Sequence, residues 1–158
     1  MAKATFVYVT YIRTTTEKLW TALTDAEFMK QYWFGIHCES LWTAGSSWKL
    51  VHPDGRIAAA GAIVGAEPPK RLVIRWQDQI RPELKAEGES HCTMELESIG
   101  RAAKLSITHT IEHEPSNLIV LLSNSWPKVI SNLKSLLETG SSVLPDPFPV
   151  SSTDAGKA

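Results

Sequence analysis

Residues 116–139, SNLIVLLSNSWPKVISNLKSLLET, decide the fold of this chain. At 100° per residue, the apolar side chains of this stretch fall within one arc about 120° wide. These side chains are Leu118, Ile119, Leu122, Trp126, Val129, Ile130, Leu133, Leu136 and Leu137. Ser116 can cap the start of a helix and Gly140 can end its last turn. The pattern predicts an amphipathic helix roughly 36 Å long, which needs a broad apolar surface to pack against.

The middle of the chain is expected to supply that surface as an antiparallel sheet. Apolar and polar side chains alternate clearly in three stretches, which predicts strands with one face in water and short turns between them. Gly61 and Gly65 indicate a bulge or strong curvature. The charged stretch 78–88 contains Pro82 and Gly88 and is interpreted as a mobile loop. The expected strands are 5–12, 36–42, 47–51, 56–66, 71–76, 90–97 and 103–111.

Two short helices are expected directly after the first strand. Thr14 and Glu17 have the spacing of a capping box, which predicts that the first helix starts there. Thr24 or Asp25 can cap the second. This order of elements predicts an α+β fold of the helix-grip type. In it, a curved antiparallel sheet of about six to seven strands surrounds a long C-terminal helix and leaves an internal cavity.

Length and charge exclude several classes of protein. The 158 residues suit one domain, 1–140, and the Pro-rich segment 141–158 is expected to be a disordered tail. Docking of that tail through Leu144 and Phe148 is the alternative. A net charge of −1 and a pI of about 6.5 give no strong basic field for nucleic acid or an anionic membrane. The sequence shows no signal segment and no membrane-spanning run, so a cytoplasmic protein is expected.

Four stretches in the right order resemble the bacterial homologues of the activator of heat-shock-protein-90 ATPase. This family lies in the START-like, SRPBCC superfamily, together with the birch-pollen allergen. Ala26 stands where the family usually has Pro, and Ser125 replaces a Gly before Trp126. The stretches are IRTTTEKLWTALTDAEFMKQYW at 12–33, GAIVGAEPPKRLVIRW at 61–76, LSITH at 105–109, and the Ser-Trp helix motif at 125–133.

The resemblance implies a helix-grip fold with a hydrophobic cavity for small, often aromatic or lipid-like molecules. Some relatives in the superfamily are cyclases or hydrolases, so an enzyme that uses the same pocket is one alternative. The eukaryotic namesake is a co-chaperone with an additional N-terminal domain. A single-domain interaction protein of this kind is therefore a second alternative, and a role in the stress response would fit the family.

The six Trp residues are the most informative side chains. Each can be ordinary core, but several are expected to line the cavity and to offer indole N–H groups to a flat ligand. His109 is either a core histidine with a partner or a polar anchor for that ligand. The expected cavity-lining residues are Tyr8, Trp20, Phe28, Trp33, Trp76, Met94, Ile107, His109, Leu122, Trp126 and Ile130.

No catalytic constellation is visible, so a non-enzymatic binding role is preferred. The pairs His37-Cys38 and His91-Cys92 do not suggest a metal site, because adjacent residues of a strand point to opposite faces. No metal and no cofactor are expected. The expected partner is a small hydrophobic molecule rather than nucleic acid or a membrane, with a chaperone contact as the alternative. The expected state is a monomer or a weak homodimer.

Overall fold

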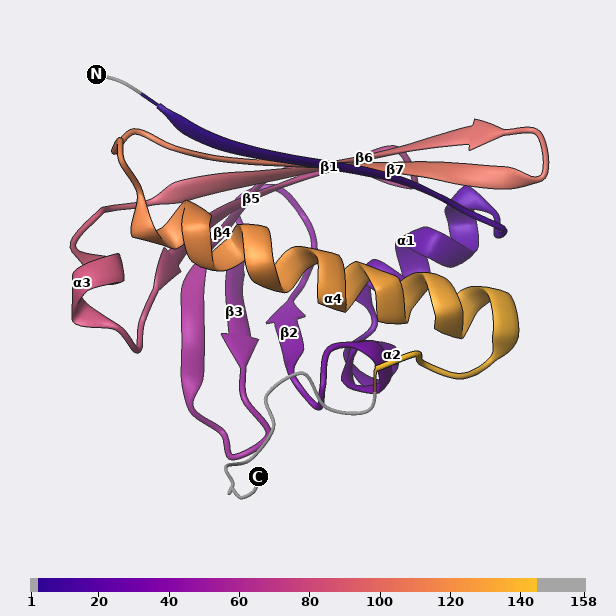
Figure 1. The fold of residues 1–158 in the computed structure, drawn as a ribbon, viewed down its shortest axis with the longest axis horizontal. Coiled ribbons are helices and arrows are strands. Elements are labelled where there is room, and N and C mark those ends of the chain that lie inside the picture. Colours follow the sequence, from indigo (N-terminus) through magenta and orange to yellow (C-terminus); the bar gives the residue numbers. More distant parts are fainter. Residues whose placement is uncertain (1–2, 145–158) are drawn as a thin grey trace.

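The computed structural model describes residues 3–144 and shows a strongly curved antiparallel sheet that wraps around one long helix (Figure 1). The seven strands follow the order β1-β7-β6-β5-β4-β3-β2, so β2 to β7 form the predicted meander and β1 pairs with β7. The α+β fold predicted from the sequence is confirmed. The strands are β1 (Ala4–Ile12), β2 (His37–Ser40), β3 (Ser47–Val51), β4 (Ile57–Glu67), β5 (Arg71–Asp78), β6 (Ser90–Ile99) and β7 (Ala102–Ile111).

Helices α1 (Thr16–Thr24) and α2 (Ala26–Tyr32) follow β1, as predicted. The N-cap of α1 is Thr15, whose hydroxyl accepts a hydrogen bond from Lys18 N at 3.1 Å, so the prediction of Thr14 was one residue early. The long helix α4 (Asn117–Thr139) has the predicted caps. Ser116 Oγ accepts from Ile119 N at 3.1 Å, and Gly140 has a left-handed φ of 89°. No helix within residues 3–144 is long and apolar enough to cross a bilayer.

The segment between β5 and β6 is structured, which corrects its interpretation as a mobile loop. It contains the one-turn helix α3 (Pro82–Lys85) and then Glu87, whose carboxylate caps the start of α4. Glu87 Oε1 accepts a hydrogen bond from Ser116 Oγ at 2.6 Å, and Oε2 accepts one from Asn117 N at 2.9 Å. A carboxylate here satisfies free N–H groups and complements the positive end of the helix dipole. Glu87 therefore fixes the N-terminal end of α4, the part of the helix that faces strands β3 to β5.

Gly61 on β4 allows the sheet to close tightly around two indoles. It pairs with Trp48 of β3 on one side and with Trp76 of β5 on the other. The two rings have centroids 4.7 Å apart. The expected irregularity near the glycines of β4 is present, because the register with β5 shifts between Ile63 and Gly65. This bulge increases the local twist of the sheet beneath α4.

The first residues of the expected tail are held against the helices. The segment that follows α4 turns back toward α2 (Figure 1). There the backbone of Val143 and Leu144 bonds to the side chain of Asn132. The remainder of the expected disordered tail, 145–158, lies outside the described residues.

Candidate functional site

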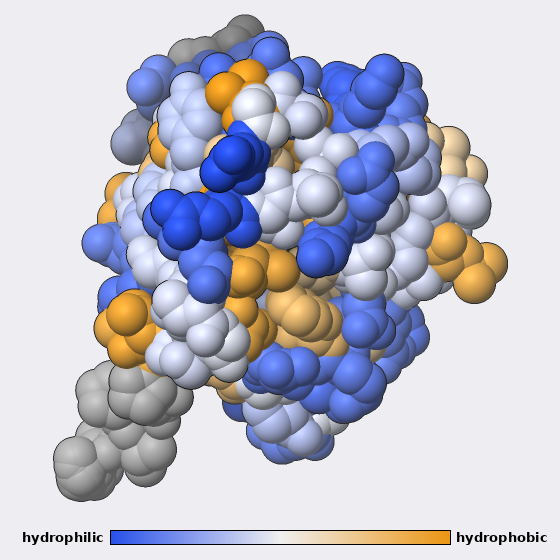
Figure 2. All heavy atoms as spheres, turned by 90° about the vertical axis from the view of Figure 1, so that its right-hand side faces the viewer, coloured by the Kyte–Doolittle hydropathy of each residue, from blue (hydrophilic) through white to orange (hydrophobic). Residues whose placement is uncertain are grey.

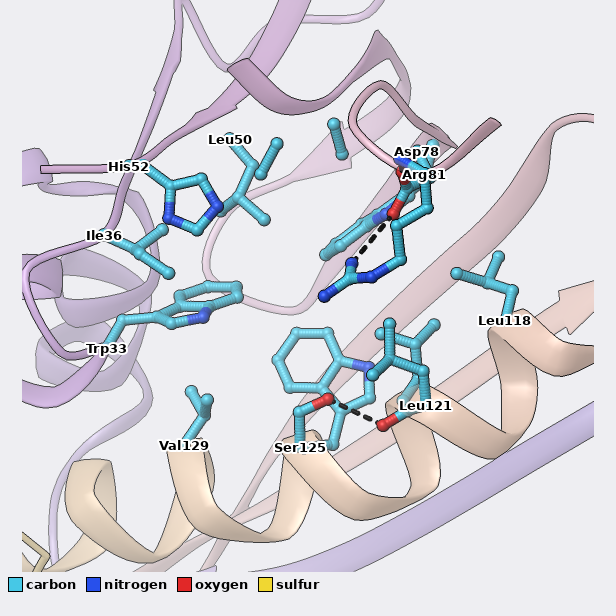
Figure 3. Close-up of a pocket in the computed structure, with 15 residues that line it drawn as sticks. Trp33, Ile36, Leu50, His52, Asp78, Arg81, Leu118, Leu121, Ser125 and Val129 are labelled. Carbon is cyan, nitrogen blue, oxygen red and sulfur yellow. Dashed lines mark hydrogen bonds and ion pairs between the residues drawn. The ribbon is translucent and has the colours of Figure 1, made fainter. Parts of the chain in front are cut away.

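A cleft of about 120 Å³ lies between the first half of α4 and the strands β3 to β5. Leu118, Leu122 and Val129 of α4 form its roof, and Leu50 and Ala59 lie across from them on β3 and β4. Figure 3 shows Leu118 and Val129 of the helix and Leu50 of the sheet around the same space. The lining is mainly apolar, with a few polar groups, which is the usual composition of a small-molecule site.

Three indoles form one wall of the cleft. The centroid of Trp126 lies 5.4 Å from that of Trp33 and 6.0 Å from that of Trp76. Their interplanar angles are 51° and 61°, so the rings meet in tilted and edge-to-face arrangements, which aromatic pairs prefer. Each indole comes from a different part of the chain. Trp33 follows α2, Trp76 is on β5 and Trp126 is on α4.

The end of α2 positions Trp33. Phe34 and Gly35 follow with left-handed φ values of 57° and 84°, so the chain reverses immediately after the indole. A side chain at Gly35 would also come within 2.8 Å of Pro53 Cγ, which leaves glycine as the residue that fits. Figure 3 shows Trp33 extending toward the cleft between Ile36 and Val129. The turn therefore fixes one wall of the site.

An ion pair lies at the side of the cleft opposite Trp33 (Figure 3). Asp78 Oδ1 accepts hydrogen bonds from Ile80 N at 2.9 Å and Arg81 N at 2.7 Å, which orders the loop after β5. Asp78 Oδ2 lies 3.5 Å from Arg81 Nη1. Figure 3 shows the Arg81 side chain reaching toward α4. Since a guanidinium has five N–H donors, this ion pair leaves donors for a ligand.

His52 also lines the cleft, from the turn after β3. Partial burial lowers the pKa of His52, and the positive charge of Arg56 lowers it further. A neutral imidazole at this place can accept or donate one hydrogen bond. The cleft thus combines one permanent cation with a neutral imidazole.

Trp126, which lines the cleft, carries a buried indole donor. Its side chain is 2% exposed, and its Nε1 has no hydrogen-bond partner among residues 3–144. A buried polar group without a partner costs roughly 1–3 kcal/mol. An acceptor atom that reached Trp126 Nε1 would remove this cost.

His109 and Ser90 form a buried pair that does not resemble a catalytic dyad. Ser90 Oγ donates to Trp76 O at 3.1 Å and lies 2.7 Å from His109 Nε2. Since Ser90 has only one proton, it accepts from His109 Nε2–H, and Nδ1 carries no proton. Burial lowers the pKa of His109 to about 3, with a smaller contribution from His91. Both side chains are fully buried, so neither is placed to attack a substrate.

The sequence-predicted site residues divide between the cleft and other places. Trp33, Trp76, Leu122 and Trp126 line the cleft together. The other predicted residues do not line it. The structure places Met94 and Ile130 around a void of only about 10 Å³ in the core, and Ile107 and His109 in the buried face of β7.

The remaining three predicted residues lie farther away. Tyr8 is half-buried on β1 and stacks on Phe6 with centroids 6.4 Å apart. Trp20 is half-buried on α1. Phe28 lines a shallow recess with Leu137. Figure 2 looks at the end of the molecule where α4 finishes, and it shows apolar side chains gathered in a central hollow within a hydrophilic face.

Sequence reasoning did not identify the polar groups of the cleft. Asp78 and Arg81 lay in the stretch interpreted as a mobile loop, and His52 was not considered. A signal was present, since Asp is frequent at turns and Pro82 suits the first turn of a helix. Leu121 and Ser125 were also missed, because they lie at the border of the apolar arc of α4.

The cysteines do not contribute to a metal site. No group of three or more potential metal ligands occurs in the part of the chain that the structure describes. Cys38 and Cys92 are buried free thiols. Burial raises the pKa of Cys92 to about 12 and raises that of Cys38 strongly, so both remain protonated at neutral pH.

Comparison with known families agrees with this architecture. Residues 13–138 match the model of the family described as Activator of Hsp90 ATPase homolog 1-like protein. The chain belongs to this family. The resemblance inferred from the four sequence stretches is therefore confirmed. A search of curated proteins found no match.

Solved structures of other proteins share this fold. CalU16 from Micromonospora echinospora has a TM-score of 0.69 at 18% identity, over 86% of this chain and 77% of that one. The Aha1 dimer from Colwellia psychrerythraea has a TM-score of 0.70 at 19% identity, over 87% and 98%. An HSP90 activator from Plasmodium falciparum has a TM-score of 0.68 at 21% identity, over 84% and 95%. At these identities the similarity shows the fold alone.

Proposed function

We propose that this protein binds a small aromatic molecule in the cleft between α4 and strands β3 to β5. The observation that carries the proposal is the buried, unpartnered indole N–H of Trp126 in a cleft with two further indoles. An aromatic ring can pack against Trp33 and Trp76 by edge-to-face contact. An acceptor atom on the same ligand can pair with the N–H of Trp126, which removes the cost of an unsatisfied donor.

The volume of the cleft limits the size of the ligand. An apolar cavity of about 150 Å³ accommodates benzene, so about 120 Å³ suits roughly one six-membered ring. Any larger part of the ligand would extend through the open side, where Arg81 is half-exposed. A carboxylate or another anionic group on the ring would match the free donors of that guanidinium. The class of ligand we propose is a monocyclic or bicyclic aromatic acid.

Ligand titration followed by NMR tests this proposal. Benzoate and indole-3-carboxylate are added to 15N-labelled protein while the indole N–H signals are followed, with benzyl alcohol as the neutral comparison. We expect saturable shifts of Trp33 and Trp126, tighter binding of the acids, and no shift of Trp20 on α1. The absence of saturation for all of these compounds would count against the cleft as a binding site.

A pair of serine variants localises the binding. Ser125 Oγ and Ser123 Oγ both donate to carbonyls of α4, at 2.8 and 2.7 Å, but only Ser125 lines the cleft. Ser125→Leu should fill part of the cleft and weaken binding at least about tenfold, a loss of about 1.4 kcal/mol. Ser123→Leu, at an exposed position of the same helix, should bind as the unchanged protein does. Equal effects of the two variants would place the ligand elsewhere.

A second candidate function is contact with a chaperone, and the outer face of β1 favours it. Val7, Val9 and Tyr11 are 59%, 46% and 51% exposed on this edge strand. Exposed apolar side chains in a row are typical of an interaction surface. One of the similar structures is described as an HSP90 activator.

An ATPase assay tests the second candidate. If the outer face of β1 binds a chaperone, the purified protein should stimulate the ATPase of Hsp90, and Val9→Lys should reduce the stimulation. Val64→Lys, at an exposed position of β4, serves as the matched control. Stimulation that is absent, or that both variants reduce equally, would exclude a role of this face.

A further inference from the structure

A groove runs along α1 at the end of the molecule where α4 finishes, and we call it the α1 groove. It has two adjoining parts, which share the side chains of Glu17, Lys18 and Leu137. One part, of about 320 Å³, lies between α1, α2 and α4. The other, of about 430 Å³, lies between the loop before α1 and the turn that joins β6 to β7. Among residues 3–144, none lines both this groove and the cleft.

The first part of the groove has an apolar wall. Ala22 of α1, Phe28 of α2 and Leu137 of α4 line it. Phe28 and Leu137 are half-buried, so part of their apolar surface remains in contact with water. Figure 2 shows this end of the molecule, where apolar side chains lie in a hollow among hydrophilic ones. An alkyl chain that covered these side chains would remove apolar surface from water, which is favourable.

The second part of the groove is positively charged. Arg13, Lys18 and Arg101 line it with one carboxylate, that of Glu17, so its formal charge is +2 in a chain of net charge −1. None of the three cationic side chains forms an ion pair within residues 3–144. Clustered charges of one sign attract a ligand of the opposite sign. A guanidinium can also bind a carboxylate or phosphate through two parallel hydrogen bonds.

Hydrogen bonds hold the walls of this charged part in place. Glu138 Oε2 accepts from Arg13 N at 2.8 Å and from Lys134 Nζ at 2.9 Å, which joins the loop before α1 to the end of α4. The bond from Lys134 and then that from Arg13 N lower the pKa of Glu138. Thr15 Oγ1 accepts from Lys18 N at 3.1 Å and fixes the start of α1. Since the Glu138 carboxylate already has these partners, the Arg13 guanidinium remains available to a ligand.

We propose that the α1 groove binds a single-chain anionic amphiphile, a molecule with one alkyl chain and a carboxylate or phosphate head group. The alkyl chain packs on Phe28 and Leu137, and the head group lies between Lys18 and Arg101. The two parts of the groove adjoin at Lys18 and Leu137, so one molecule can contact both. Because Phe28 and Leu137 line a recess, a chain that enters it can cover them, whereas a flat bilayer surface cannot.

An NMR titration with decanoate, below the concentration at which it forms micelles, tests this site. We expect saturable shifts of the amide signals of 17, 18, 22, 101 and 137, while the indole N–H signals of Trp33 and Trp126 in the cleft stay in place. Decanoate should bind at least about fourfold more tightly than octanoate, because burial of one CH₂ group corresponds to about fourfold in affinity.

A cationic amphiphile with an equally long chain tests the role of charge. Decyltrimethylammonium should bind at least about tenfold more weakly than decanoate. Equal binding of the two compounds would overturn the cationic head-group site. Decanoate shifts that are confined to the indole signals of the cleft would overturn the α1 groove as the binding site.

A matched pair of charge reversals localises the head group. Arg101→Glu should weaken decanoate binding at least about tenfold. Lys85→Glu on α3, at the opposite end of the molecule, should leave it unchanged (Figure 1). Both positions are exposed, so neither change should disturb the fold. Equal effects of the two variants would reflect net charge alone and would overturn the site.

The apolar wall and the bilayer alternative need separate measurements. Phe28→Ala should weaken decanoate binding and reduce the preference for decanoate over octanoate, and an unchanged preference would contradict the place of the alkyl chain. Flotation with phosphatidylglycerol vesicles detects membrane binding. Flotation that Arg101→Glu abolishes, together with no response to decanoate, would overturn the free amphiphile in favour of a bilayer. Benzoate reports on the cleft and decanoate on the α1 groove, so the failure of either proposal leaves the other standing.

Discussion

Replacement of Gly61 by Ala tests how the sheet forms the aromatic wall of the site. Gly61 lies between Trp48 on β3 and Trp76 on β5, whose rings meet above it. A methyl group at this position would fall well inside the van der Waals contact distance of the Arg75 carbonyl oxygen and 3.2 Å from Trp76 N. The obstacle is backbone rather than a flexible side chain, so β4 and β5 would have to separate.

The expected loss in the free energy of unfolding of Gly61→Ala is the sum of two contributions. Forcing extra atoms into a packed region costs about 1–3 kcal/mol. Separation of the strands weakens about two ladder hydrogen bonds, each with a net contribution of about 0.5–1.5 kcal/mol. The sum is about 2–6 kcal/mol, which is a large part of the stability of an ordinary domain. We therefore expect Gly61→Ala to be severely destabilised.

Urea unfolding followed by circular dichroism measures this loss, and Gly65→Ala is its matched control. Gly65 lies on the same strand, and a methyl group there would meet no atom within 4 Å. Since Ala has less backbone freedom than Gly in the unfolded chain, Gly65→Ala should be neutral or slightly stabilising. A loss below about 1 kcal/mol for Gly61→Ala, or equal losses for the two variants, would refute the close approach of β4 to β5.

Three further predictions concern the helix and the buried histidine. Trp126→Ala should cost about 3–5 kcal/mol in urea unfolding, because the indole is fully buried; a loss below 1 kcal/mol would be inconsistent with its packing. Because the pKa of His109 is lowered to about 3 in the folded state, only the unfolded chain takes up this proton as the pH falls below about 6.5. Stability should therefore decrease by up to about 1.4 kcal/mol per pH unit from there toward pH 3, and His109→Gln should show a smaller slope between pH 6.5 and 5. Glu87→Gln should cost about 1 kcal/mol in thermal unfolding through the weakened cap of α4, whereas Glu83→Gln on α3 should have no measurable effect.

The elements that could be predicted from sequence are those set by local periodicity. The apolar arc of 116–139, with Ser116 and Gly140 at its ends, contains enough information to place α4 almost to the residue. Strict alternation of apolar and polar residues likewise placed β6 and β7 to within two residues. The one-turn helix α3 was missed because four residues carry no periodic signal, although Pro82 at its start was an indication.

The site was harder to predict because it depends on which large side chains meet in space. Trp48 and Trp76 meet only because Gly61 between them lacks a side chain, and pairing between strands cannot be obtained from each strand alone. Trp20 and Tyr8 are large aromatic residues like Trp33, so the sequence alone does not distinguish them. In the structure they lie outside the cleft. The pairing of Arg81 with Asp78 depends on a turn that sequence patterns indicate only weakly.

The reactivity of the two buried thiols can report how often the sheet around them opens. Cys38 on β2 and Cys92 on β6 stay protonated and shielded while the sheet is intact, so an alkylating reagent must wait for these strands to separate. The rate of alkylation at each thiol would then measure how often its part of the sheet opens. Equal rates would mean that the sheet opens as one cooperative unit, whereas faster reaction at Cys38 would mean that the short strand β2 detaches first.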